Sequence, residues 1–292
     1  MDIGAFVPIG SLNANPTFTK ALGPALEERG FESVWVAEHV VLFDEYASQY
    51  PYAENGRFPG GGDTGLLEPL TALAYLAATT DTLRLGTGIC LVPQRNPVYT
   101  AKQVVDVDVL SGGRVDFGVG IGWLREEFEA VAMPFERRGD RTREHLEVMK
   151  ALWCDDPSSY DGELYHLPEC RMYPKPVQQP HPPIHFGGET DAAFRRVADM
   201  GQGWYGFNRS PEEVPGALAR LEELLAERSR SLSDITVSIC PYFKGVDAAA
   251  LERFAELGVD RVIAVVFAID RDGLLSTLDS FVKDVIEPAQ LG

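Results

Sequence analysis

The chain has 292 residues, of which 45% are hydrophobic and 24% are charged. These fractions are ordinary for a globular protein and exclude a mostly disordered, collagen-like or fibrous chain. Forty-four acidic residues against 26 basic residues give a net charge of −18. This excess of negative charge repels nucleic acids and anionic lipids, so we expect neither a nucleic acid nor a membrane as a partner.

The cysteines and the first residues indicate where the protein resides. None of the four cysteines belongs to a C-x-x-C pair, which in a chain of this size favours reduced thiols over a disulfide framework. The first residues begin a strand-like apolar run and carry no basic segment typical of a secretory signal. No apolar run is long enough to span a bilayer. We therefore expect a cytoplasmic protein.

Short apolar runs alternate with helical patterns along most of the chain. Asn15-Pro16 and Asn96-Pro97 each combine an N-cap residue with proline at the first helical position. Ser210 to Glu213 forms a capping box, and Asp247 caps a later helix. The expected strands are 3–9, one that begins with 34–36, and then 83–91, 115–119, 184–186, 204–207, 235–239 and 262–267.

The number and composition of these strands predict the fold. About eight mostly apolar strands, alternating with helices, suit a parallel sheet that is buried on both faces. Together with the chain length, they favour an α/β protein of the (β/α)8 TIM barrel type, with a doubly wound open sheet as the alternative. We expect one domain over 1–292, with an insertion at 155–183 before the fifth strand. A loop at 43–65 after the second strand is either an active-site loop or a solvated surface loop.

A glycine-rich segment, Gly118-Val119-Gly120-Ile121-Gly122-Trp123, follows one strand and precedes a helix. A dinucleotide-binding fingerprint requires glycine where Trp123 stands, so we reject that interpretation. The glycines at 118, 120 and 122 either allow close backbone packing at a barrel mouth or let a planar ligand approach the backbone.

A second glycine pair, Gly187-Gly188, joins the fifth expected strand to a helix and is followed by Thr190. Free N–H groups at this helix start, together with the threonine hydroxyl, are suited to a phosphate. A left-handed turn followed by an N-cap explains the same residues equally well.

Glu38 and His39 end the second expected strand. In a barrel this end faces the catalytic side, where a histidine beside a carboxylate could act as an acid or a base near neutral pH. A capped strand end is the structural alternative. The prolines within His181-Pro-Pro-Ile-His185 prevent helical ligand spacing, so we expect no metal site.

Taken in order, the motifs of this chain resemble the bacterial luciferase-like flavin monooxygenase superfamily. The resemblance is greatest to the branch that depends on coenzyme F420, a 5-deazaflavin, and it covers essentially the whole chain. The motifs are Val34-Trp35-Val36-Ala37-Glu38-His39, Leu85-Gly86-Thr87-Gly88, Arg95-Asn96-Pro97, Leu110-Ser111-Gly112-Gly113-Arg114, Gly118 to Trp123, Glu126-Glu127-Phe128, Pro174-Lys175-Pro176-Val177, Pro182-Pro183-Ile184 and Gly187-Gly188.

This resemblance implies a flavin or deazaflavin ring at the barrel mouth, with the catalytic pair Glu38 and His39 beside it. It places a bulge with a cis peptide at Gly88-Ile89, which supports the ring. It assigns cofactor binding to Gly88, Ile89, Gly118, Gly120, Gly122, Trp123, Gly187, Gly188 and Thr190. Trp123 departs from relatives that have an acid at this position, which argues against chemistry that needs a carboxylate there.

The expected function is hydride transfer between coenzyme F420 and a small organic substrate. An FMN-dependent monooxygenase that uses O2 is the alternative, and a non-catalytic flavin-binding protein is a weaker one because Glu38 and His39 are both present. The anionic tail of F420 requires basic residues at the rim, and the chain offers arginines at 137, 138, 141, 143, 195 and 196. The expected partner is a small molecule, and a homodimer remains open beside a monomer.

Overall fold

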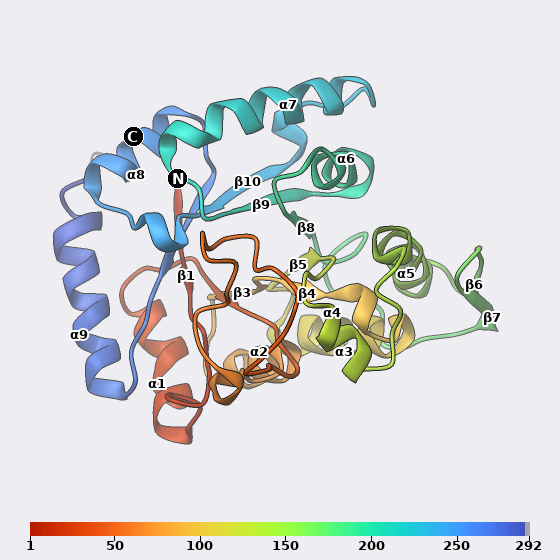
Figure 1. Ribbon diagram of the computed structural model, residues 1–292, viewed down its shortest axis with the longest axis horizontal. Helices are drawn as coiled ribbons and strands as arrows, with labels where there is room; N and C mark the ends of the chain where they lie inside the picture. The colour runs from red at the N-terminus through yellow and green to blue at the C-terminus, as the bar shows by residue number, and fades with distance from the viewer. Residues whose placement is uncertain (290–292) are drawn as a thin grey trace.

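Within residues 1–289, which the structure describes, eight parallel strands close into a barrel surrounded by helices (Figure 1). The barrel strands are β1 (Asp2–Phe6), β2 (Ser33–Val36), β3 (Arg84–Thr87) with its continuation β4 (Cys90–Leu91), β5 (Val115–Gly120), β8 (Ile184–Gly187), β9 (Gly203–Phe207), β10 (Thr236–Cys240) and β11 (Arg261–Val265). In this computed structural model the strands pair in the order β3-β2-β1-β11-β10-β9-β8-β5, and pairing of β3 with β5 closes the ring. The predicted (β/α)8 barrel is confirmed, and the open sheet is excluded. The last three residues of the predicted domain lie outside the described residues.

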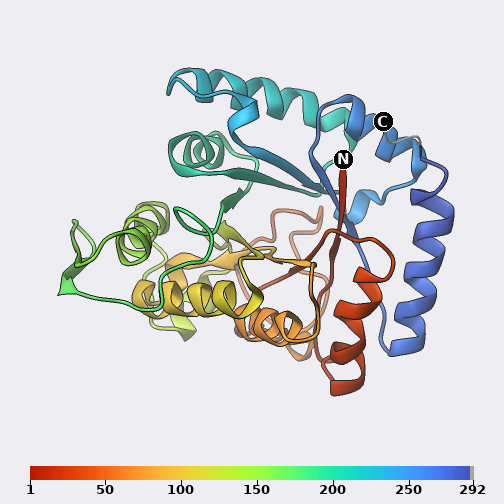
Figure 2. The ribbon, with the colours of Figure 1, turned by 180° about the vertical axis from the view of Figure 1, so that it is seen from behind.

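Helices cover the outside of the barrel, as the views from both sides show (Figures 1 and 2). Several begin at the predicted caps: Asn15, Asn96 and Asp247 each accept a hydrogen bond from a backbone N–H of the first turn. The helices are α1 (Pro16–Glu27), α2 (Pro69–Ala77), α3 (Pro97–Ser111), α4 (Arg125–Ala130), α5 (Arg138–Cys154), α6 (Asp191–Met200), α7 (Val214–Ala226), α8 (Ala248–Glu256) and α9 (Arg271–Phe281). No helix of the described part is both long and apolar enough to cross a membrane.

The apolar core has two parts because the strands are buried on both faces. The larger part lies between the strands and the helices and includes Val34 and Phe117. The smaller part lies inside the barrel, where Trp35 packs against Tyr205 with ring centroids 5.2 Å apart. This two-sided burial explains why the strands are largely apolar rather than alternating.

The third barrel strand is interrupted where the sequence predicts one run over 83–91. β3 ends at Thr87, the Gly88–Ile89 peptide is cis, and β4 resumes at Cys90. The cis peptide that the resemblance predicts at this position is therefore confirmed. Beyond the interruption, β4 continues the pairing with β5.

The predicted insertion at 155–183 precedes β8, the fifth strand of the barrel. It contains an antiparallel hairpin of β6 (Ser158–Asp161) and β7 (His166–Cys170). Figure 1 shows this hairpin projecting outward beyond α5. The insertion thus extends the outer surface of the protein.

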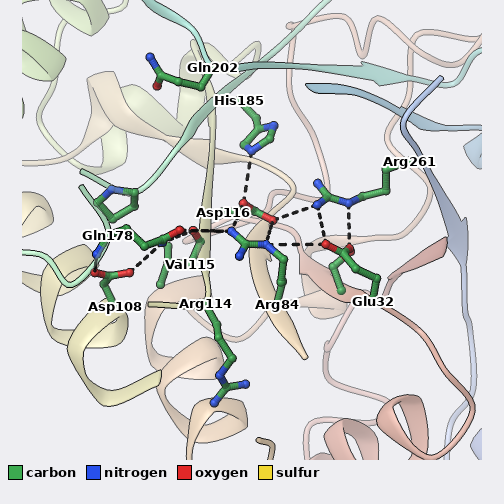
Figure 3. Close-up of polar contacts among 12 residues, drawn as sticks. Glu32, Arg84, Asp108, Arg114, Val115, Asp116, Gln178, His185, Gln202 and Arg261 are labelled. Atoms are coloured by element: carbon green, nitrogen blue, oxygen red, sulfur yellow. Dashed lines mark hydrogen bonds and ion pairs between the residues drawn. The ribbon is translucent and has the colours of Figure 1, made fainter. Parts of the chain in front are cut away.

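A buried polar network occupies the barrel floor, at the amino ends of the strands (Figure 3). Asp116 is 2% exposed and accepts hydrogen bonds from Arg84 at 2.5 and 2.9 Å. Its carboxylate also lies 3.4 Å from Arg261 Nη2 and 3.4 Å from His185 Nε2. Arg261 in turn donates to both carboxylate oxygens of Glu32, at 2.7 and 2.9 Å. Polar groups at this end of a barrel stabilise the fold, while chemistry takes place at the other end.

Candidate active site

The carboxyl ends of four neighbouring strands gather the predicted site residues at one mouth of the barrel. Since all pairings among these strands are parallel, the strands end on the same side. The residues are Glu38 and His39 after β2, Gly88 and Ile89 between β3 and β4, Gly118 and Gly120 on β5, Gly122 and Trp123 beyond it, Gly187 at the end of β8, and Gly188 and Thr190 before α6.

Three of the glycines make room for the Ile89 side chain. A Cβ atom added to Gly120 would lie 2.0 Å from Ile89 Cδ1, and one added to Gly187 would lie 2.8 Å from the same atom. A Cβ on Gly118 would lie 3.3 Å from Ile89 Cγ2 and 1.9 Å from the carbonyl oxygen of Thr87. Close packing at the mouth, one of the two explanations offered by the sequence, thus accounts for these glycines. The absence of side chains at these glycines leaves room for the Ile89 side chain, which packs over their Cα atoms.

The imidazole of His39 is held by a carboxylate from α4. Its Nδ1 lies 3.1 Å from Oε2 of Glu127, whose side chain is fully buried. Glu127 also accepts hydrogen bonds from the backbone N–H of Val40 at 2.8 Å and from Nε2 of Gln94 at 3.1 Å. Because the buried carboxylate accepts a hydrogen bond from the ring, Nδ1 is the protonated nitrogen, and Nε2 is left to exchange a proton with a ligand. Nε2 has no hydrogen-bond partner among the described residues.

The sequence interpretation pairs His39 with Glu38, and the structure corrects this pairing. Glu38 instead accepts a hydrogen bond from the backbone N–H of Leu91 at 2.5 Å and one from Arg95 Nε at 2.7 Å. It thus anchors the strand segment just beyond the cis peptide. Sequence reasoning missed Glu127 as the partner of His39, although the Glu126-Glu127-Phe128 motif was a signal that could have identified it.

Aromatic side chains of the 43–65 loop pack around Trp123 and His39. The ring centroids of Tyr50 and Trp123 are 5.2 Å apart, and those of Tyr46 and Trp123 are 5.6 Å apart. Phe58 lies at 5.0 Å from the His39 ring. These apolar rings surround the histidine and reduce its access to water.

The 43–65 loop is tied to both sides of the mouth. Glu126 on α4 accepts hydrogen bonds from Ala47 N at 2.6 Å and from Ser48 Oγ at 2.7 Å. On the opposite side, the Tyr52 hydroxyl donates to Glu189 at 3.1 Å. Burial raises the pKa of Glu189, which lies in the loop that begins with Gly187. In Figure 1 the orange 43–65 loop passes in front of the barrel strands, so it covers the mouth.

The loop after β8 combines a left-handed glycine with a helix cap. Gly188 has φ of 104°, and its carbonyl accepts a hydrogen bond from Trp204 Nε1 at 3.1 Å. The Thr190 side chain caps α6 by accepting from Ala193 N at 3.2 Å. A capped turn thus describes the observed contacts, and the Thr190 O–H remains able to donate to a ligand.

Gly122 lets the chain turn from β5 into α4. Its φ is 75°, and a Cβ at this position would lie 2.8 Å from Phe128 Cε2. The Gly122 carbonyl accepts a hydrogen bond from Arg138 Nε at 3.1 Å. The turn therefore places Trp123 over the mouth and links β5 to the start of α5.

Comparison with known proteins agrees with this arrangement. The family model described as luciferase-like monooxygenase matches residues 1–272. The uncharacterized protein Rv0940c of Mycobacterium tuberculosis is 31% identical over 247 residues, covering 85% of this chain and 84% of that protein. The FMNH(2)-dependent dimethylsulfone monooxygenase of Pseudomonas putida is 30% identical over 216 residues, covering 73% of this chain and 56% of that protein.

A solved structure has the same fold at lower sequence identity. The coenzyme F420-dependent tetrahydromethanopterin reductase of Methanopyrus kandleri superposes with a TM-score of 0.75 at 19% identity, covering 99% of both chains. Since the family model spans nearly the whole chain, this protein belongs to the luciferase-like monooxygenase family.

Proposed function

We propose that this protein is an oxidoreductase that transfers hydride between coenzyme F420 and a small organic substrate, with His39 exchanging the accompanying proton. The observation that carries this proposal is the contact of His39 with the buried Glu127 at the same mouth as the Gly88–Ile89 peptide. A bound flavin or deazaflavin supplies the hydride chemistry, while the protein provides orientation, water exclusion and proton transfer.

His39 is suited to proton transfer because only one of its ring nitrogens is engaged. Glu127 fixes Nδ1, so the neutral ring presents the lone pair of Nε2. The aromatic side chains around it hold the imidazole in one orientation. A positioned acid or base of this kind accelerates a reaction by about 10²- to 10⁴-fold.

The residues at the mouth fit a planar ring with a phosphorylated side chain. Ile89 offers an apolar surface, and the buried Tyr205 hydroxyl has no nitrogen or oxygen partner among the described residues. That hydroxyl lies 2.9 Å from the position of a Cβ on Gly88, so a polar group bound there would give it a partner. We assign catalysis to His39, with Glu38 holding the strand segment beyond the cis peptide in place. We assign cofactor binding to Gly88, Ile89, Gly118, Gly120, Gly122, Trp123, Gly187, Gly188 and Thr190.

A second candidate function is that of an FMN-dependent monooxygenase that uses O2. It is favoured by the 30% identity to a monooxygenase whose name specifies FMNH2, although this chain spans only 56% of that protein. Both cofactors carry a tricyclic ring, a ribityl chain and a phosphate, so the same mouth serves either.

Parallel titration of the purified protein with F420 and FMN separates the two candidates. Micromolar or tighter binding of F420, with FMN much weaker, supports the proposal. Tight FMN binding together with oxygen-dependent substrate oxidation would replace it with the monooxygenase.

The role of His39 is tested by His39→Ala. Hydride transfer should slow by about 10²- to 10⁴-fold, the range for a lost acid or base, while cofactor affinity changes much less. If the rate and its pH profile stay unchanged, His39 is a structural residue and the assignment fails.

A further inference from the structure

Six arginines near the starts of α5 and α6 differ in whether they are already neutralised or engaged. Within the described residues, Arg137, Arg143 and Arg195 each form an ion pair with a carboxylate, and Arg141 donates to two backbone carbonyls. Arg138 donates to one backbone carbonyl, and Arg196 has no hydrogen bond or ion pair. The engaged arginines and their partners are Arg137 with Glu163 at 2.6 Å, Arg141 with the carbonyls of Pro134 at 2.6 Å and Glu136 at 3.1 Å, Arg143 with Glu147 at 4.0 Å, and Arg195 with Asp191 at 2.8 Å.

Arg138 and Arg196 lie close to each other on two different helices. Arg196 Nη1 is 3.6 Å from the position of a Cβ on Gly139, the residue after Arg138. The Arg138 guanidinium lies over the Phe135 ring, 3.9 Å from its centroid, and its Nε donates to Gly122 O at 3.1 Å. Both side chains are half-buried. Two cations that form no ion pair thus lie side by side in a partly desolvated region, and Glu136 is the acid whose charge acts on Arg138.

This arrangement is unfavourable unless an anion completes it. Burial, and then the charge of Arg138, lower the pKa of Arg196. Burial and the neighbouring Arg125 likewise lower the pKa of Arg138. The chain has 44 acidic residues against 26 basic ones, so acidic partners for arginines are plentiful elsewhere on its surface. Adjacent unpaired guanidiniums are therefore the donors expected for a bound anion, since planar N–H groups suit phosphate oxygens.

The position of the pair connects it to the predicted cofactor loops. Arg138 contacts Gly122 beyond β5, and β5 pairs with β8, which ends at Gly187. Arg196 lies on α6, the helix that Thr190 caps after Gly188. We propose that Arg138 and Arg196 form the binding site for the phosphate group of the flavin or deazaflavin. This inference rests on the proposed function, and it holds for either cofactor.

The test combines arginine variants with ligands that lack the phosphate. Arg138→Met and Arg196→Met should each weaken FMN or F420 binding by about 10- to 100-fold, the value of a lost charged hydrogen bond. Binding of riboflavin, or of the dephosphorylated deazaflavin, should stay unchanged. Arg195→Met is the matched control, because it removes the same charge from the adjacent position of α6. Comparing the affinities for FMN and F420 also shows which of the two phosphorylated cofactors the protein binds.

A stability measurement distinguishes ligand binding from a structural role. Without ligand, the thermal midpoint of Arg196→Met should equal or exceed that of the wild type, since the substitution removes an uncompensated half-buried charge. A lower midpoint, or an equal loss of affinity for riboflavin and FMN, would overturn the assignment. Unchanged affinity for the phosphorylated ligand would overturn it as well.

Failure of the proposed function gives a different result from failure of this inference. If the wild type binds neither ring, the proposed function is wrong, and calorimetry with inorganic pyrophosphate then tests the arginine pair directly. Pyrophosphate binding that Arg196→Met abolishes and Arg195→Met retains supports the anion site. Absence of pyrophosphate binding to the wild type would discard the anion site as well.

Discussion

The Nδ1 atom of His39 lies 3.1 Å from Oε2 of Glu127, a residue 88 positions further along the chain. His39 follows strand β2, and Glu127 belongs to α4, the short helix that follows strand β5. Glu127 also accepts from Val40 N and Gln94 Nε2, so its carboxylate is fixed by three donors from two segments. This geometry makes Glu127 a positioning residue for the histidine.

Glu127→Gln should slow the proposed hydride transfer by about 10- to 100-fold, less than the loss expected for His39→Ala. The amide lacks the negative charge that balances a protonated imidazole, so the shape of the pH–rate profile should change as well. Stopped-flow measurement across pH checks both effects. Glu129→Gln, at an exposed position of the same helix, is the control. An unaltered pH profile with a reduced rate would indicate a purely structural contribution.

Gly120→Ala should destabilise the protein by about 1–3 kcal/mol, because its Cβ would lie 2.0 Å from Ile89 Cδ1. Ile89→Val removes that Cδ1 atom, so the double variant should recover part of the lost stability. Gly118→Ala should show no such recovery, because its Cβ would meet the Thr87 carbonyl oxygen at 1.9 Å. Urea denaturation of the single and double variants measures this coupling. Equal recovery for both glycines would contradict the packing described here.

The barrel-floor network should make stability depend on acid pH. Burial by itself would raise the pKa of Asp116, but the nearby His185, the hydrogen bonds from Arg84 and the charge of Arg261 outweigh it and hold that pKa well below its usual value. A lowered native pKa gives stability that is present above the unfolded-state value of about 3.9 and is lost as pH falls towards the native value.

Asp116→Asn should therefore lower the free energy of unfolding at pH 7 by about 3–5 kcal/mol, because Arg84 and Arg261 lose a buried counter-charge. The variant should also lose less stability than the wild type between about pH 4 and pH 2. Urea midpoints over this range provide the measurement. Asp272→Asn, whose side chain is 90% exposed, is the control. Parallel acid curves for the wild type and Asp116→Asn would refute the role of this carboxylate.

Tyr52→Phe should loosen the loop over the mouth, because it removes the hydroxyl that donates to Glu189 at 3.1 Å. A hydrogen bond of this kind contributes about 1 kcal/mol, so amide exchange within 43–65 should become about 5-fold faster. Hydrogen–deuterium exchange with mass spectrometry measures this change. Tyr75→Phe, at an exposed position on α2, should leave the exchange unaltered. The same exchange rate in Tyr52→Phe would show that packing alone holds the loop.

Much of the fold follows from local patterns in the sequence. Apolar runs such as 34–36 and 115–119 form strands because both of their faces are buried, and Asn15 and Asn96 start helices because their side chains bind the free N–H groups of the first turn. The order of the motifs also located the interruption at Gly88–Ile89. Such features depend on residues that are close together in the chain.

Contacts between distant segments were decided only by the tertiary structure. The sequence places Glu38 beside His39, but backbone geometry directs Glu38 to Arg95 and brings Glu127 to the histidine from 88 positions away. The partners of charged and polar side chains are the groups that lie within hydrogen-bond distance once the barrel has closed. Neighbouring positions in the sequence do not determine that distance. For the same reason the sequence alone placed six arginines in two groups along the chain, whereas only the folded chain shows that Arg138 and Arg196, from two different helices, lie beside each other.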